Sequence, residues 1–96
     1  MSVVRIDCII PDGADADRRI DRLGGPRPDG PERWEDPIDN IINYIRNGTH
    51  SFYTMVGNRA VDVVVRVHPT SGRFYLTTEG DGFPPNNLLN LGRCQR

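Results

Sequence analysis

Lysine is absent from this 96-residue chain, so all 12 basic side chains are arginine. Arginine suits planar, bidentate pairing with carboxylates or phosphates, but a GC-rich genome produces the same bias, and we favour that explanation. With 13 acidic residues the net charge is −1, which disfavours a protein whose main task is to neutralise phosphates. The charge through Asn40 is 6 − 10 = −4 and beyond it 6 − 3 = +3, so a local basic face stays open.

Long apolar runs are also missing. None approaches the roughly 18 residues of a membrane helix, and no charged-then-apolar start resembles a signal peptide. We therefore expect no membrane association and a cytoplasmic protein. The length fits a single domain over residues 1–96.

Cysteine and histidine are scarce, with two of each. Cys8 and Cys94 are too far apart for metal-ligand spacing, so we expect two reduced thiols, with a bridge between them as the less favoured alternative. His50 and His68 are interpreted as exposed loop residues, because neither has a local nucleophile or carboxylate to serve as a general base. We expect no catalytic residue, no metal and no cofactor.

The hydrophobic periodicity predicts an α+β domain with a small antiparallel sheet and one main helix packed on one face. The predicted elements are a strand over 3–10, a weak helix within 12–23, a Gly/Pro-rich surface loop over 24–33, a helix over 37–47, strands over 52–56, 60–68 and 73–78, and one helical turn near Leu88, Leu89 and Leu91. The short connections between the last three strands require antiparallel pairing. The sheet therefore has three or four strands, with the place of strand 3–10 left open.

The helix over 37–47 has the strongest signal. Its isoleucines recur at i, i+3, i+4 and i+7, which places them on one face; they are Ile38, Ile41, Ile42 and Ile45. Asp36 is the expected N-cap, Pro37 the first helical residue and Gly48 the terminator, with Trp34 packed over the helix start. The isoleucine face should cover a valine row in strand 60–68, namely Val61, Val63, Val65 and Val67.

One set of residues, spread over most of the chain, carries a resemblance to known proteins: Trp34, 38–42, Gly48, Phe52, Tyr53, 75–78, Asp81, Gly82, 86–89, Leu91 and Cys94. With these residues the chain resembles a family of small bacterial proteins classed as a domain of unknown function. The carboxy-terminal Leu-Thr-Thr, Asp-Gly, Asn-Asn-Leu-Leu and Cys combination is the most specific part. The chain departs from the family pattern at Gly92, where a proline is usual, and in its enlarged loop 24–33. The resemblance implies a shared fold and surface feature, but no reaction.

Two surfaces are candidate sites. The first is a polar loop next to apolar anchors, made of Thr77, Thr78, Glu79, Asp81, Asn86 and Asn87. Its oxygen atoms suit a ligand or cation, although turn-fixing by the same side chains is the favoured interpretation. The second is a basic and aromatic sheet face made of Arg59, Arg66, Arg73, Tyr53 and Tyr75, a pattern found in single-strand binders and in ordinary half-exposed sheets.

Three function classes follow from these surfaces. The favoured one is a small non-catalytic interaction module that acts through a partner protein or self-association. Nucleic-acid binding through the Arg/Tyr face is disfavoured but kept as an alternative. An enzyme or ligand-binding protein that uses the loop over 77–87 is the other alternative.

Overall fold

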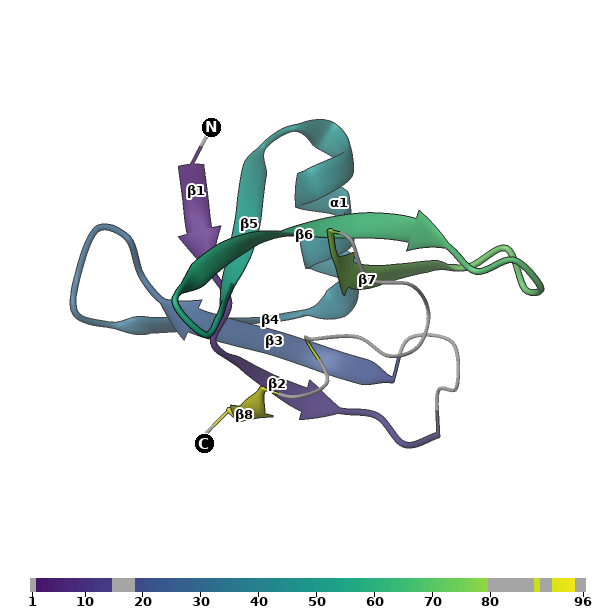
Figure 1. The fold of residues 1–96 in the computed structure, drawn as a ribbon, viewed down its shortest axis with the longest axis horizontal. Helices are drawn as coiled ribbons and strands as arrows, with labels where there is room; N and C mark the ends of the chain where they lie inside the picture. Colours follow the sequence, from purple (N-terminus) through teal and green to yellow (C-terminus); the bar gives the residue numbers. More distant parts are fainter. Residues whose placement is uncertain (1, 15–18, 80–87, 89–90, 95–96) are drawn as a thin grey trace.

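The computed structural model describes residues 2–14, 19–79, 88 and 91–94. Within these residues the chain forms one helix and eight strands (Figure 1). In chain order they are β1 (Ser2–Arg5), β2 (Cys8–Pro11), β3 (Ile20–Pro26), β4 (Arg33–Pro37), α1 (Ile38–Asn47), β5 (His50–Val56), β6 (Arg59–Val67), β7 (Phe74–Thr78) and β8 (Gly92–Arg93).

The strands form two sheets in place of the single small sheet that we predicted. Sheet A has the order β1-β5-β6-β7, and sheet B has the order β4-β3-β2-β8. The predicted antiparallel meander of β5, β6 and β7 is confirmed, and β1 joins it parallel to β5. The α+β class is therefore confirmed, with more strands than expected.

The predicted strand over 3–10 is two strands that belong to different sheets. The Ile6 N–H donates to the Tyr53 carbonyl of sheet A, and the next N–H, of Asp7, donates to the Gly24 carbonyl of sheet B. The buried Thr54 hydroxyl donates to the Ile6 carbonyl at 2.8 Å. The alternation of buried and exposed residues, which predicted a single strand, is interrupted at this switch. Cys8 and its neighbour Ile9 are both buried.

The predicted weak helix within 12–23 and the loop over 24–33 are also wrong in part, and residues 15–18 of that predicted helix lie outside the described residues. Ile20 begins strand β3, and only residues 27–32 turn between β3 and β4. Gly24 and Gly25 lie within strand β3, at the point where the backbones of neighbouring segments approach it closely. A Cβ on Gly25 would overlap the Arg5 carbonyl oxygen, and one on Gly24 would lie 2.8 Å from the Trp34 carbonyl oxygen. These glycines allow two strands to approach and do not interrupt the sheet.

Helix α1 begins one residue after the predicted start and ends as predicted. Asp36 is not its cap, because Pro37 holds the N-cap position in an extended conformation and no side chain caps the helix. Asp36 and Pro37 instead continue strand β4, paired with β3. Gly48 ends the helix with a φ of 72°, the left-handed conformation that glycine adopts readily.

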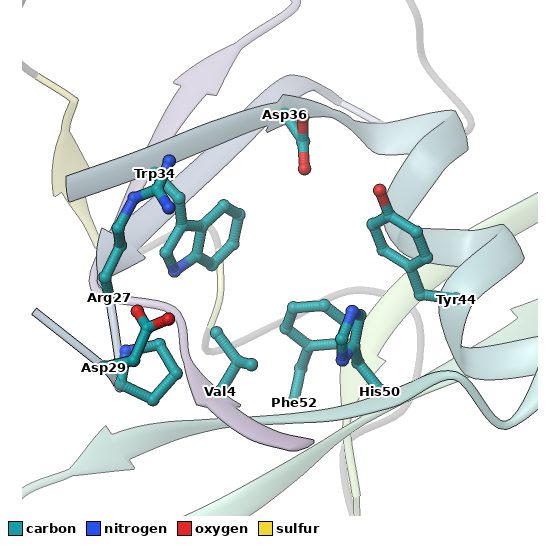
Figure 2. A pocket seen from close by; sticks show the side chains of 9 residues that line it. Val4, Arg27, Asp29, Trp34, Asp36, Tyr44, His50 and Phe52 are labelled. Atoms are coloured by element: carbon teal, nitrogen blue, oxygen red, sulfur yellow. The ribbon is translucent and has the colours of Figure 1, made fainter. Parts of the chain in front are cut away.

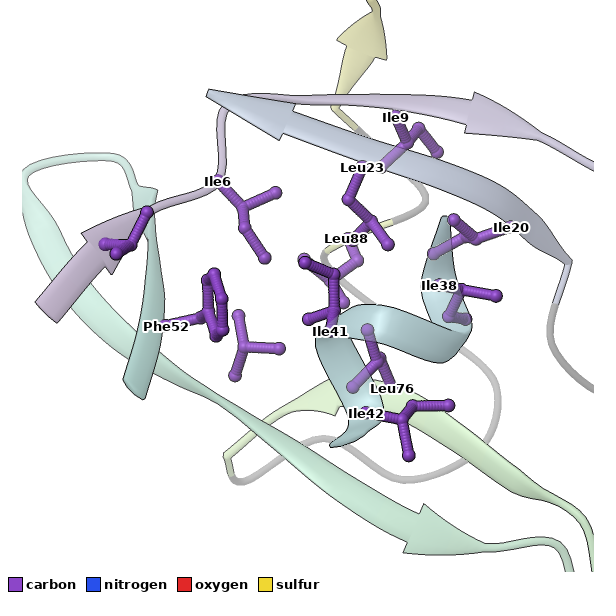
Figure 3. Close-up of a cluster of buried hydrophobic side chains, with 12 residues drawn as sticks. Ile6, Ile9, Ile20, Leu23, Ile38, Ile41, Ile42, Phe52, Leu76 and Leu88 are labelled. Atoms are coloured by element: carbon purple, nitrogen blue, oxygen red, sulfur yellow. The ribbon is translucent and has the colours of Figure 1, made fainter. Parts of the chain in front are cut away.

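The core lies between the two sheets and the helix, as Figure 3 shows. Ile41 projects from α1 into a cluster that gathers side chains from both sheets and from Leu88. The expected contact between the isoleucine face and the valine row is confirmed for the middle of the valine row. Val63 is buried there, and Val65 packs against the cluster. Val67 is 56% exposed, because β6 extends beyond the helix.

The prediction of two reduced thiols is wrong, because Cys8 and Cys94 form a disulfide. Strand β8 pairs parallel to β2, and the Cys94 N–H donates to the Ile9 carbonyl, which brings the two cysteines together. Upstream of β8, Leu88 is buried in a 3₁₀ turn closed by the Leu91 N–H, as predicted. Leu89 lies outside the described residues.

In the described part of the chain, no helix has the length and apolar character needed to cross a membrane.

Candidate functional site

An aromatic groove opens where the two sheets and the helix meet (Figure 2). Its volume is about 260 Å³, and both sheets, α1 and the β3–β4 turn contribute to its walls. The residues that line it are Val4, Arg27, Pro28, Asp29, Trp34, Asp36, Tyr44, His50 and Phe52.

Local structure explains why these side chains converge. Val4 and Phe52 are direct partners in the parallel pairing of β1 with β5, so they project to the same side of sheet A. Trp34 and Asp36 are two residues apart on β4, which places them on one face of sheet B. Tyr44 follows Ile41 by three positions on α1 and lies at the border of its buried face. Strand β4 is an edge of sheet B, so among the described residues no strand pairs with its outer side.

Phe52 is the centre of the aromatic set. Its ring centroid lies 5.8 Å from that of Trp34 and 6.4 Å from that of Tyr44. His50 packs edge-on against Tyr44, with centroids 5.0 Å apart. In Figure 2 Trp34 and Tyr44 lie on opposite sides of the opening. Phe52 lies below the opening, and Asp36 lies on the side opposite Phe52. Aromatic rings thus line the groove, which is open to solvent.

Two polar atoms of this set are buried without a hydrogen-bond partner, Trp34 Nε1 and His50 Nδ1. An unsatisfied buried polar atom costs about 1–3 kcal/mol, and native proteins keep few of them. The expectation that His50 is an exposed loop residue is therefore wrong: it begins β5 and is half-buried. His68 lies just after β6 and caps a turn, where its Nδ1 accepts from the Thr70 and Ser71 N–H groups.

The groove carries an acidic excess. Its charged lining consists of one guanidinium, Arg27, and two carboxylates, Asp29 and Asp36, which gives 1 − 2 = −1. Arg27 lies 3.9 Å from the Glu32 carboxylate, which offsets part of its charge. Asp36 is half-buried and has no side-chain partner among the described residues.

The predicted polar loop is described only at its start. Thr77 and Thr78 lie in β7 and are fully buried, whereas Glu79 is exposed directly after the strand. The Glu79 N–H donates to the Asp62 carbonyl. Asp81, Asn86 and Asn87 lie outside the described residues, so a ligand role for this loop stays a prediction.

The predicted Arg/Tyr face is brought together in part. Arg66 and Tyr75 are direct cross-strand partners, and so are Tyr53 and Asp62, which puts these four side chains on the outer face of sheet A. Tyr75 is 6% exposed. Arg59 is an odd number of residues from Arg66 on the same strand, so it points to the opposite face, and Arg73 lies just before β7.

A second polar cluster surrounds the disulfide. Arg33 forms a two-pronged ion pair with Asp7, with Nη1 3.1 Å from Oδ2, and its Nη2 also reaches Cys8 Sγ at 3.5 Å. The hydrogen bond with Asp7 raises the pKa of the exposed Arg33 guanidinium above its usual value. No group of three or more metal-ligating side chains occurs among the residues that the structure describes.

Sequence reasoning missed the aromatic groove, because it assigned Trp34 to the helix start and Phe52 to a strand without relating them. The available signal was the concentration of aromatic residues between Trp34 and Tyr53 in a chain with only 7% aromatics. Their convergence depends on the two-sheet arrangement, which the periodicity does not reveal.

The comparisons with known proteins give one match. Residues 3–92 match the model of a family described as "Protein of unknown function (DUF3892)". No curated protein and no solved structure matches the chain. The matched segment covers the whole aromatic groove and ends before Cys94.

Proposed function

The chain belongs to that family, and we propose that it is a small non-catalytic interaction module that binds a partner polypeptide in the aromatic groove. The observation that carries the proposal is the groove lined by the rings of Trp34, Tyr44 and Phe52, which lies beside β4, an edge strand of sheet B in the described structure.

Aromatic side chains dominate the energetics of protein interfaces, because they bury large areas and lose little conformational entropy. Trp34 and Tyr44 are half-buried in the free chain, so a partner can still cover them. Strand β4 is also an edge of sheet B in the described structure, and an extended peptide can pair with an edge strand, the mode called strand addition. Both features favour a polypeptide as the bound molecule.

Nucleic-acid binding through the Arg/Tyr face is the weaker alternative. Arg66 has Tyr75 beside it, but that ring is buried and unsuited to stacking on a base. Asp62 adds a negative charge to the same face, and the three proposed arginines do not share one side of the sheet. Self-association through β1, an edge of sheet A with Val3 62% exposed, and ligand binding by the loop over 77–87 are further alternatives.

The bacterial origin and the shared carboxy-terminal signature are predictions drawn from the resemblance. Cytoplasmic localisation is also a prediction, and the disulfide argues against a strongly reducing compartment.

The proposal is tested by selecting linear peptides from a random display library against the whole chain. Binding is then measured by fluorescence anisotropy for the wild type and for Tyr44→Ala. We expect the variant to bind the selected peptides at least about tenfold more weakly, as interface tyrosines do.

Tyr53→Ala is the matched control, because Tyr53 is equally half-buried but lies on the outer face of sheet A. It should retain affinity within about twofold. Circular dichroism establishes that both variants are folded. Failure to select any peptide, or peptides that respond to Tyr53→Ala and not to Tyr44→Ala, would overturn the proposal.

A further inference from the structure

This inference rests on the proposed function and names the chemistry that the groove accepts. We infer that the groove receives a basic side chain of the partner polypeptide, an arginine guanidinium or a lysine ammonium. The aromatic rings would hold its charged end, and Asp36 would pair with it.

The ring geometry suits a cation. A positive group is attracted to an aromatic face when it lies within about 6 Å of the ring centroid. Phe52 lies 5.8 Å from Trp34 and 6.4 Å from Tyr44, and no ring contact joins Trp34 to Tyr44 in the described structure. Phe52 is itself buried, with 4% of its surface exposed, and forms the floor of the opening, so a guest lies between the half-buried rings of Trp34 and Tyr44 (Figure 2).

The charges point to the same guest. The Asp36 carboxylate faces the opening between Trp34 and Tyr44 (Figure 2) and has no side-chain partner among the described residues. A neutral guest would remove water from this half-buried carboxylate without replacing its hydrogen bonds, which is unfavourable. A basic guest supplies the missing donors and forms a charge-assisted pair. Arg27 weakens this preference, but Asp29 and Glu32 offset its charge.

A polypeptide is favoured over a free organic cation because of the neighbouring edge. Strand β4 carries both Trp34 and Asp36 and has no strand on its outer side in the described structure. An extended peptide that pairs with this edge would place alternate side chains toward the groove. A small free cation could not use these backbone groups.

The chain provides its own reporter, because Trp34 is the single tryptophan. Blocked Gly-Gly-X-Gly-Gly peptides with X as arginine, lysine or citrulline are titrated while Trp34 fluorescence and its indole N–H resonance are followed. We expect the arginine and lysine peptides to bind with Kd values of order 1 mM. The citrulline peptide, which has nearly the shape of arginine without its charge, should bind at least about fivefold more weakly.

Asp36→Asn removes the carboxylate charge with little change of shape and should weaken the basic peptides about five- to tenfold. The matched control is Asp62→Asn, which removes an exposed carboxylate on the outer face of sheet A and should leave binding within about twofold. Equal affinity for citrulline and arginine, or equal losses for the two variants, would overturn the inference.

Two further outcomes separate this inference from the proposed function. Selected peptides that lack basic residues yet depend on Tyr44 would retain the interaction module and refute the basic guest. Tetramethylammonium that binds as tightly as the arginine peptide, with the same response to Asp36→Asn, would refute a polypeptide source.

Discussion

The disulfide between Cys8 and Cys94 should contribute a large share of the free energy of unfolding. It closes a loop across a sequence separation of 86 residues. In the chain-entropy model, a closed loop of this length lowers the entropy of the unfolded chain by roughly 15 cal/mol/K, or about 4.6 kcal/mol at 25 °C. A domain of this size has a total stability of roughly 5–14 kcal/mol, so the loss is a substantial fraction of the whole.

The perturbation is reduction of the disulfide, with the double variant Cys8→Ser, Cys94→Ser as a non-reducible reference. Urea unfolding followed by Trp34 fluorescence gives the free energy of unfolding and the m-value. We expect the oxidised wild type to be more stable by about 3–5 kcal/mol and to have the lower m-value, because its unfolded state is more compact. The double variant should not respond to the reductant.

A difference below about 1 kcal/mol between oxidised and reduced wild type would refute this reasoning. It would mean that the pairing of β8 with β2 holds the chain end without the covalent link. A second check is kinetic: oxidation should mainly slow unfolding if the cysteines approach each other only after the transition state of folding, and mainly accelerate folding if they approach before it.

Two other predictions concern the point where the chain passes from sheet A to sheet B. Gly25→Ala should destabilise the fold by more than about 3 kcal/mol or prevent folding, because its Cβ would overlap the Arg5 carbonyl oxygen. Gly30→Ala is the control, because Gly30 lies at an open turn position. Similar thermal midpoints for the two variants would contradict the close approach of the Arg5 carbonyl to Gly25. Thr54→Val should cost about 1–3 kcal/mol in urea unfolding, because it leaves the Ile6 carbonyl without the Thr54 donor, and an unchanged midpoint would show that this hydrogen bond does not stabilise the switch.

The sequence predicted elements whose signals are local. The isoleucine spacing of α1 and the short connections around β6 are complete within a few residues, so both were predicted closely. The strand switch after Ile6 depends on partners near Tyr53 and Gly24, and the disulfide depends on a residue near the far end of the chain. Gly24 and Gly25 misled the prediction because glycine serves both turns and close strand crossings, and only the neighbouring chain decides which.

The same distinction applies to the candidate site. Trp34, Tyr44 and Phe52 stand out individually, but their convergence requires a β-strand from each sheet and one helix. The predicted Arg/Tyr face failed to gather all three arginines because strand register fixes the direction of each side chain. Asp36 was expected to cap the helix, since a carboxylate before Pro37 is typical of that position, and it points into the groove because β4 continues to the helix start.

The parallel pairing of β1 with β5 has a consequence for the order of events during synthesis. Residues 2–5 are synthesised before their partners, residues 50–53, and β2 acquires β8 only when Gly92 and Arg93 have been made. Strand β1 must therefore stay unpaired, with Val4 exposed to solvent, until β5 has been translated.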